Sequence, residues 1–129
     1  MGVKMHENDL SYAIRGAAFK VHSTLGPGLL ESVYETALAY ELRKDGFDVL
    51  TQLGVPVIYE EVEMEQGFRM DILVNQKVIV EVKSVETLLD VHHKQLLTYL
   101  KLTDKKLGLL INFNTSTLSN SITRIVNNL

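Results

Sequence analysis

Residues 78–85, VIVEVKSV, constrain the fold more than any other part of this 129-residue chain. Their run of β-branched valine and isoleucine is typical of a buried strand. Glu81 and Lys83 interrupt the run, and they share one face because side chains alternate along a strand, whereas Val80 and Val82 take the other face. Charged side chains are almost never fully buried unless they are paired or bind something. We therefore expect this strand to carry a polar site on one face.

The preceding segment adds a second carboxylate, Asp71, in the other half of an expected hairpin that joins 67–74 to 77–85. The length of the turn decides where this carboxylate lies. A two-residue turn sets Asp71 beside Val80, on the wrong face, whereas a three-residue connection sets it directly opposite Glu81.

In the second register Asp71, Glu81 and Lys83 converge. Two carboxylates about 4 Å apart repel each other by about 4 kcal/mol at an effective dielectric constant of about 20, and one lysine does not neutralise both. A divalent cation does, and hard oxygen ligands suit Mg²⁺. The alternative is an ordinary cross-strand ion pair with Asp71 facing solvent. The D-x9-E-x-K spacing by itself does not decide between them.

The rest of the chain predicts an α/β fold in which helices surround a mixed sheet. Hydrophobic spacing and turn signals predict helices over about 8–25 and 29–45, extended segments at 47–53, 55–62, 67–74 and 77–85, a helix over about 91–102, and a buried strand at 107–113. The tail at 118–129 allows a helix or a strand, and its β-branched run favours a strand. The expected order is α-α-β-β-β-β-α-β plus a C-terminal strand or helix.

Helix ends and helix faces follow from the same patterns. Asn8 or Asp9 is expected to cap the first helix and Asp90 the third. Glu41 falls inside the apolar stripe of the second helix, so it is expected to pair with a buried basic group, for which Arg69 is the candidate. That stripe is expected to consist of Leu30, Val33, Tyr34, Ala37 and Leu38.

Length and composition indicate a single domain, residues 8–129, after a flexible tail at 1–7. The absence of cysteine excludes disulfides and thiolate metal sites. The formal net charge of −3 argues against a protein that coats nucleic acid by bulk charge, but not against one that grips a phosphate through a metal. No apolar stretch reaches the length of a membrane span, so no membrane partner and a cytoplasmic location are expected.

Two motifs resemble a known family. Asp71 together with Glu81-Val82-Lys83 resembles the active-site signature of the PD-(D/E)xK nuclease superfamily, although methionine rather than proline precedes Asp71. GLLESVY at 28–34 resembles the G-x-x-E-x-x-Y signature of the GxxExxY protein family within that superfamily. The similarity is co-linear over nearly the whole chain, including the stretches DILV, IVEVKSVETL, QLLTYLK and GLLINF.

The resemblance implies a PD-(D/E)xK nuclease-like mixed β-sheet flanked by helices, and it assigns roles. Asp71 and Glu81, with Glu31 as a further ligand, would hold Mg²⁺, for which Mn²⁺ is a substitute. Lys83 would orient the attacking water and stabilise charge on the phosphate. From the residues alone, Glu31 could instead be a first-turn glutamate favoured by the helix dipole. Tyr34 is expected to pack beneath Glu31 and to position it.

His92, Gln95 and Tyr99 are expected on one face of the third helix, at i, i+3 and i+7. Gln95 and Tyr99 resemble the Q-x-x-x-Y motif of exonuclease-like members of the superfamily. This implies that Gln95 contacts the DNA backbone or holds Lys83, and that Tyr99 buttresses it. Tyr99 and His92 are expected to contribute to substrate binding. An ordinary amphipathic helix explains the leucines of this segment equally well. His92 and His93 lack a third ligand at zinc-like spacing, so zinc is not expected.

Together these features predict Mg²⁺-dependent hydrolysis of phosphodiester bonds in nucleic acid, with DNA as the favoured substrate, by a metal-activated water. The alternative is a catalytically silent module of the same fold that binds nucleic acid or a protein partner. The acidic composition and small size give that alternative some weight. A homodimer could supply the binding surface that a chain of 129 residues lacks.

Overall fold

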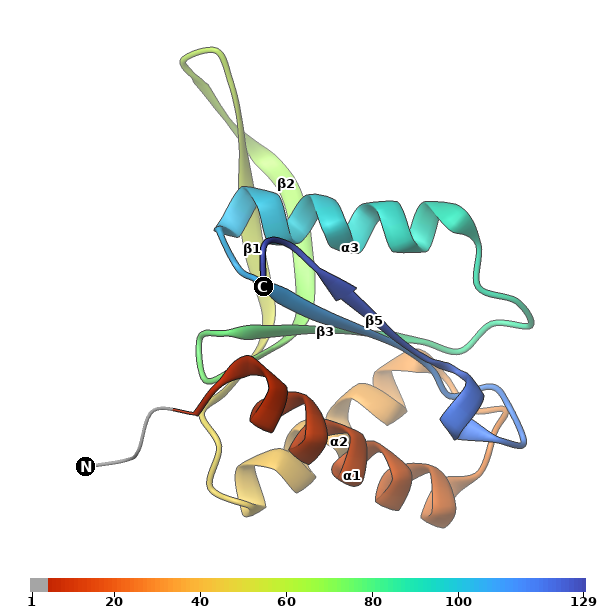
Figure 1. Cartoon of the computed structure of the whole chain (residues 1–129). Helices are drawn as coiled ribbons and strands as arrows, with labels where there is room; N and C mark the ends of the chain where they lie inside the picture. The colour runs from red at the N-terminus through yellow and green to blue at the C-terminus, as the bar shows by residue number, and fades with distance from the viewer. Residues whose placement is uncertain (1–4) are drawn as a thin grey trace.

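The computed structural model describes residues 5–129, except for the side chains at 65 and 66. These residues form three α-helices and a five-stranded mixed sheet in the order β1-β2-β3-β4-β5. Along the chain the elements are α1 (Glu7–Leu25), α2 (Glu31–Lys44), β1 (Val49–Tyr59), β2 (Val62–Val74), β3 (Val78–Lys83), α3 (Asp90–Thr103), β4 (Leu107–Asn112), a 3₁₀ turn η1 (Leu118–Asn120) and β5 (Ile122–Val126). Figure 1 shows α1 and α2 on one face of the sheet and α3 on the other. No helix in this part of the chain is long and apolar enough to cross a membrane.

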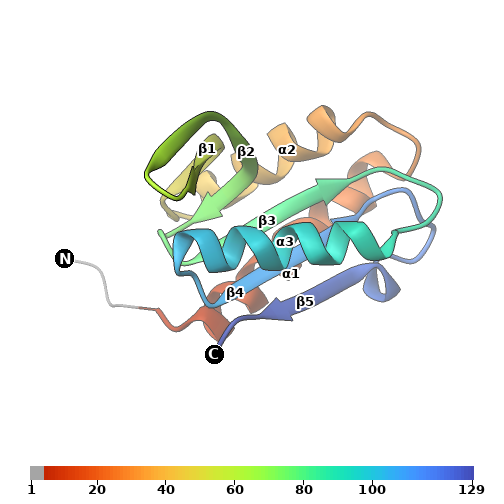
Figure 2. The same ribbon diagram turned by 90° about the horizontal axis from the view of Figure 1, so that it is seen from above.

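The sheet is antiparallel except at its centre. β1, β2 and β3 are successively antiparallel, β3 runs parallel to β4, and β5 returns antiparallel to β4. Parallel neighbours need a long crossover, and α3 provides it. Figure 2 shows α3 lying over β3 and β4, with which it is in contact. The expected fold class, a mixed sheet flanked by helices, is confirmed.

Two expected strands, 47–53 and 55–62, are in fact one continuous strand, β1. Pro56 does not break it, because β1 is an edge strand in which a missing N–H is tolerated. A register shift between Val55 and Val57 accommodates the proline. The order is therefore α-α-β-β-β-α-β-β, with one strand fewer before α3 than expected. The ambiguous tail does form a strand, β5, which pairs with β4.

The N-terminus of α1 lies ahead of its expected cap. The backbone N–H of Asn8 donates to Nδ1 of His6 at 3.0 Å, so His6 is the N-cap, and not Asn8 or Asp9. Met5, one residue earlier, packs against the core. Of the expected seven-residue tail, the first four residues lie outside the described residues, and the last residue already belongs to α1.

The N-terminus of α3 uses an imidazole in a similar way. The backbone N–H of Leu89 donates to Nδ1 of His92 at 3.0 Å. Asp90, the expected cap, is the first residue of the helix itself. A histidine nitrogen therefore takes the place of a carboxylate at both helix starts.

The core has two layers, one on each face of the sheet. The layer over α1 and α2 includes Leu10, Ile14, Val21, Tyr34, Leu38, Leu42, Ile72, Val74, Val78, Val80, Val82, Leu109, Ile111 and Phe113. The layer under α3 consists of Val55, Met70, Leu73, Ile79, Leu96, Tyr99, Leu100 and Leu110. β4 is buried along its whole length because both of its faces are covered, which explains its uninterrupted apolar run.

The buried face of α2 differs from the expected stripe. Leu30 and Val33 are 74% and 40% exposed, and the residues that α2 buries are Tyr34, Leu38, Ala39 and Leu42. The difference arises because the helix begins only after Leu30, with its inward face centred on the i, i+4, i+8 series. Glu41 pairs with Lys20 at 3.0 Å and with Lys44 at 3.2 Å, so the expected pairing with Arg69 is wrong.

At Gln52 and Asp71, the buried side chains of β1 and β2 switch from one core layer to the other. Met70 belongs to the core layer under α3, whereas Ile72, two residues on, belongs to the layer over α1 and α2. Residues two apart on a regular strand share a face, so β2 twists sharply at Asp71. The register sets Gln52 across from Asp71, and Gln52 has a left-handed φ of 53°. Figure 1 shows the consequence, since β1 and β2 rise steeply past α3 and away from β3.

Candidate active site at the fork between β2 and β3

The hairpin between β2 and β3 has the three-residue register. Val74 pairs with Val78, and the first two residues of the connection turn the chain with positive φ of 51° and 58°. This register sets Asp71 opposite Glu81 rather than beside Val80. The predicted three-residue connection is therefore present.

β2 and β3 separate at these two residues, Asp71 and Glu81. We call this point of separation the fork. Their ladder ends at Ile72 and Val80, while β3 continues beside β4. The backbone N–H of Asp71 donates to Oε2 of Glu81, and the N–H of Val82 donates to Oδ2 of Asp71, each at 2.8 Å. Each carboxylate thereby satisfies a backbone donor that the fork releases.

Burial and mutual repulsion act on both carboxyl groups. Burial, followed by the charge of Asp71, raises the pKa of Glu81 from 4.5 to about 8. Burial also raises the pKa of Asp71, although the hydrogen bond from Val82 and the charge of Lys83 oppose it. Glu81 is only 4% exposed. Two acids held together in this way favour a proton or a cation between them.

Lys83 lies two residues beyond Glu81 on the same face of β3. Its charge lowers the pKa of both carboxyl groups, which places the ammonium near them. Lys83 takes part in none of the ion pairs found among residues 5–129. Asp71 is half-buried in the fork. The structure therefore does not have the simple ion pair with a solvent-facing Asp71.

Glu31, the first residue of α2, lies at the mouth of the site. Its Oε2 accepts the N–H of Ser84, just beyond β3, at 3.2 Å. The Ser84 hydroxyl donates to the C=O of Leu29 at 2.6 Å. The structure thus brings Glu31 to the strand that carries Glu81 and Lys83, but engages it in joining α2 to the end of β3.

Tyr34 is a buried packing residue, as expected. Its ring stacks on Phe113 with the centroids 4.6 Å apart and the planes 6° from parallel. Its hydroxyl donates to the C=O of Gly26 at 2.5 Å and accepts the N–H of Leu29 at 3.1 Å. The loop before α2 is therefore anchored from inside, which fixes where Glu31 stands.

Glu35 is a site residue that sequence reasoning missed. It follows Glu31 by one helical turn, and this i, i+4 spacing is the signal that reveals it. Burial, followed by the charge of Asp71, raises the pKa of Glu35, and both side chains line the same cleft. The side-chain amide of Gln52 donates to Oε1 of Glu35 at 2.7 Å. Gln52 was missed as well, because a glutamine in an edge strand carries no distinguishing pattern.

α3 brings Tyr99 to the carboxylates from the opposite face of the sheet. Tyr99 is 3% exposed, and burial together with the charges of Glu81 and Asp71 raises its pKa to about 12. Gln95 is half-buried one turn earlier on the helix, and Nδ1 of His92 is occupied in capping it. Within the described residues, neither of these two makes a hydrogen bond to the acidic residues of the site. The substrate contacts expected of Gln95, Tyr99 and His92 stay predictions.

A cleft of about 700 Å³ opens between α2 and the fork. Its lining residues are Leu29, Leu30, Glu31, Ser32, Glu35, Gln52, Asp71 and Ser84. Glu81 is not among them and meets Asp71 from the buried side. A groove of similar size between α1 and α2 is mainly apolar and carries none of these acidic groups. The carboxylate pair is therefore accessible from solvent through this cleft, by way of Asp71.

The donor set suits a hard divalent cation. Asp71 and Glu81 offer carboxylate oxygens, and Mg²⁺ commonly takes only one or two carboxylates, with waters completing its shell. Among the residues that the structure describes, no three acidic or histidine side chains stand close enough together to hold a metal. The pair therefore fits the cation, but the expected three-residue set that includes Glu31 is not assembled.

Comparison with known protein families gives a match over most of the chain. A model of the PD-(D/E)XK nuclease superfamily matches residues 8–125. No curated protein and no solved structure matches the chain significantly. The matched span contains Asp71, Glu81 and Lys83, which the structure brings together at the fork. The fold, the paired carboxylates and the neighbouring lysine all agree with this match, and the chain belongs to the PD-(D/E)XK nuclease superfamily.

Proposed function

We propose that this protein is a Mg²⁺-dependent phosphodiesterase that hydrolyses DNA, with Mn²⁺ as a substitute. The carboxylate pair at the fork carries the proposal. Asp71 and Glu81 are held by each other's strands, both have a raised pKa, and no ion pair neutralises them among the described residues. Such an arrangement costs stability without a cation and is typical of a functional site.

The roles follow from the position of each group. Asp71 and Glu81 would hold the cation, and Glu31 stays a predicted further ligand at the mouth of the cleft. The chemistry that Mg²⁺ supplies when bound is polarisation of the scissile phosphate and a lower pKa for the attacking water. Lys83 orients that water and stabilises the charge that develops on the phosphate oxygens. Gln95, from α3, positions the nucleic-acid backbone. No side chain acts as a nucleophile.

We also propose that the chain is a member of the GxxExxY group, because each motif residue has a distinct task beside the cleft. Gly28 has a φ of 96°, a conformation that glycine adopts without strain. Glu31 joins α2 to the segment after β3. Tyr34 ties down the intervening loop through its hydroxyl. The three motif residues therefore hold the start of α2 next to the fork.

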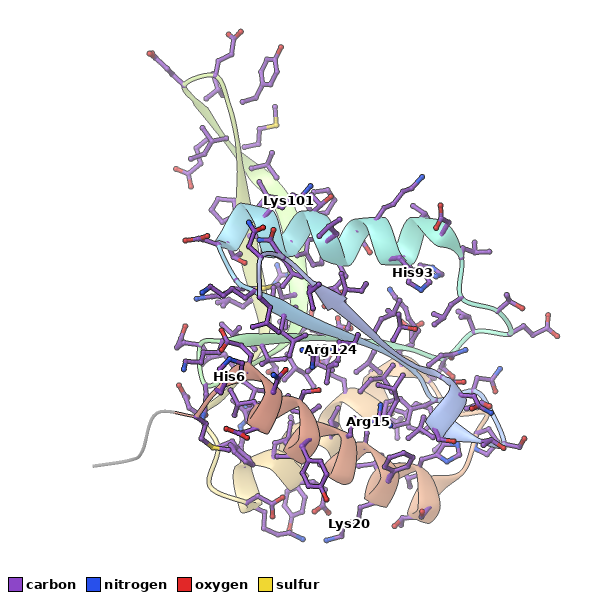
Figure 3. The ribbon with its side chains drawn as sticks, viewed as in Figure 1. His6, Arg15, Lys20, His93, Lys101 and Arg124 are labelled. Atoms are coloured by element: carbon purple, nitrogen blue, oxygen red, sulfur yellow. The ribbon has the colours of Figure 1, made fainter. Side chains whose placement is uncertain are left out.

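The distribution of charge bears on how DNA would be bound. The chain has a net charge of −3. The basic and histidine residues labelled in Figure 3 are spread over α1 and its cap, α3 and β5: His6, Arg15, Lys20, His93, Lys101 and Arg124. Affinity for phosphate then depends on the cleft and its cation more than on a basic face, so DNA binding should depend only weakly on salt.

The test is a titration of Mg²⁺ and Mn²⁺ with a mixture of single-stranded DNA, double-stranded DNA and RNA. Wild type should cleave DNA only with a divalent cation. Lys83→Ala and Asp71→Asn should each lower the rate by about a hundredfold or more. Lys101→Ala, which removes an exposed lysine of α3 (Figure 3), is the matched control and should leave the rate unchanged.

Thermal melts of the same proteins separate cation binding from chemistry. Mn²⁺ should raise the melting temperature of wild type and of Lys83→Ala, but not that of Asp71→Asn, because only a ligand that binds the folded state stabilises it. A cation-dependent rise in melting temperature without cleavage of any substrate would favour the catalytically silent module. Cleavage that persists in EDTA would contradict the proposal.

A further inference from the structure

Glu31 and Glu35 face the same cleft from α2 but make different contacts. Glu31 is exposed, and its carboxylate accepts the N–H of Ser84. Glu35 stands one turn deeper, is half-buried, and lines the cleft together with Asp71, whose charge raises the pKa of Glu35. Both glutamates therefore share the cleft with Asp71, but only Glu31 is bonded to the segment after β3.

Gln52 holds Glu35 from the other side. Its Nε2 donates to Oε1 of Glu35 at 2.7 Å, and its own C=O accepts a hydrogen bond of 3.2 Å from Nη1 of Arg69. Gln52 stands across from Asp71 in the register of β1 and β2. Its φ of 53° is unusual for a residue other than glycine and carries a cost that surrounding contacts must offset. Gln52 has this backbone conformation at the point where β1 and β2 twist away from β3. Its side-chain amide points toward α2.

These contacts form a chain of three side chains that ends at the fork. Gln52 fixes one oxygen of Glu35, and Glu35 lines the cleft together with Asp71, whose charge raises the pKa of Glu35. Asp71 in turn accepts the N–H of Val82. The orientation of Asp71 is therefore set from α2 and β1 as well as from β3. Partners of this kind, which orient a ligating side chain without being ligands, commonly control metal affinity.

We propose that Glu35, held by Gln52, is the positioning residue that orients Asp71 for the divalent cation. This inference rests on the proposed function, because it takes Asp71 as a ligand. It extends that function by assigning a role to two residues outside both sequence motifs.

The test measures the dissociation constant for Mn²⁺ alone by isothermal titration calorimetry, without nucleic acid. Glu35→Gln and Gln52→Ala should each weaken Mn²⁺ binding by about tenfold or more. The double variant should bind no more weakly than Glu35→Gln, because Gln52 acts through Glu35 and the two effects do not add. Glu63→Gln, at an exposed position of β2, makes the same change of charge away from the cleft; it is the control and should bind Mn²⁺ as wild type does.

Melting temperatures in EDTA complete the test. A merely structural role for Glu35 and Gln52 would lower the melting temperature in EDTA and leave the affinity for Mn²⁺ unchanged, which would overturn the inference. Additive effects, or an equal loss in Glu63→Gln, would also overturn it. If wild type binds Mn²⁺ and cleaves DNA while both variants bind Mn²⁺ normally, the inference fails and the proposed function stands. If wild type does not bind Mn²⁺, both fail.

Discussion

Replacing Glu81 with glutamine should make the metal-free protein more stable, by an amount that grows with pH. Burial and the charge of Asp71 raise the pKa of Glu81 from 4.5 to about 8, so the folded state binds this proton more tightly than the unfolded chain does. The stability that this proton contributes is fully present below pH 4.5 and is lost as the pH rises to about 8. At about 1.4 kcal/mol for each pKa unit, the whole change corresponds to about 5 kcal/mol.

Glutamine preserves the structure while removing the titration. Its carbonyl oxygen can accept the N–H of Asp71 that Oε2 of Glu81 accepts now. The two side chains have nearly the same volume, so the packing around position 81 changes little. A difference in stability between wild type and Glu81→Gln therefore reports the ionisation of Glu81, not a cavity.

The assay is denaturant unfolding in EDTA at a series of pH values from 5 to 8.5. The two proteins should have similar free energies of unfolding near pH 5, and the variant should become progressively more stable above it. Glu63→Gln, at an exposed position of β2, is the control and should follow wild type throughout. Parallel curves for wild type and Glu81→Gln, or a gap that closes as the pH rises, would refute the reasoning.

Three further substitutions test the structure around the site. Tyr34→Phe leaves two backbone groups of the loop before α2 without their hydroxyl partner, and thermal denaturation should show a loss of about 1–3 kcal/mol. Asn112→Ala removes the buried amide that bonds both the N–H and the C=O of Val85, and chemical denaturation should show a loss of about 2 kcal/mol. Gly67→Ala would place a Cβ 1.8 Å from the carbonyl oxygen of Val55, so hydrogen exchange should quicken in the β1–β2 hairpin while Mn²⁺ binding at the fork is retained. A change below about 0.5 kcal/mol in either of the first two, or unchanged exchange in the third, would contradict these assignments.

The register of the hairpin between β2 and β3 was predictable because few arrangements bring its charged residues to one face. Side-chain alternation fixes the face of Glu81, and only one of two turn lengths brings Asp71 to that face. The structure has that turn length. The outer faces of α3 and α2 are less constrained, and an apolar residue such as Leu30 is easily assigned to a core it does not reach. A helical wheel gives relative angles, but it does not say where the helix begins or which direction is inward.

Glu35 and the continuity of β1 were missed for different physical reasons. A glutamate one turn after Glu31 is typical of an ordinary solvent-exposed helix face. Glu35 lies near the fork only because β2 twists at Asp71. Pro56 normally signals the end of a strand, yet at the edge of a sheet its missing N–H need not interrupt pairing. Both outcomes depend on neighbours distant in sequence, which local patterns do not contain.

The twist at Gln52 and Asp71 also separates a projecting part of the sheet from its central strands. Beyond it, β1 and β2 continue as a two-stranded ribbon that projects past α3 (Figure 1). Ribbons of two strands are only marginally stable by themselves, and Ile58, Tyr59 and Val62 are each more than 60% exposed there. Amide protons should therefore exchange quickly around Ile58, Tyr59 and Val62, and slowly in β3, β4 and the part of the ribbon that packs under α3. Asp71 lies on the strand that continues into the ribbon, whereas Glu81 lies on β3 beside β4, so a force that moves the ribbon changes the distance between the two carboxylates.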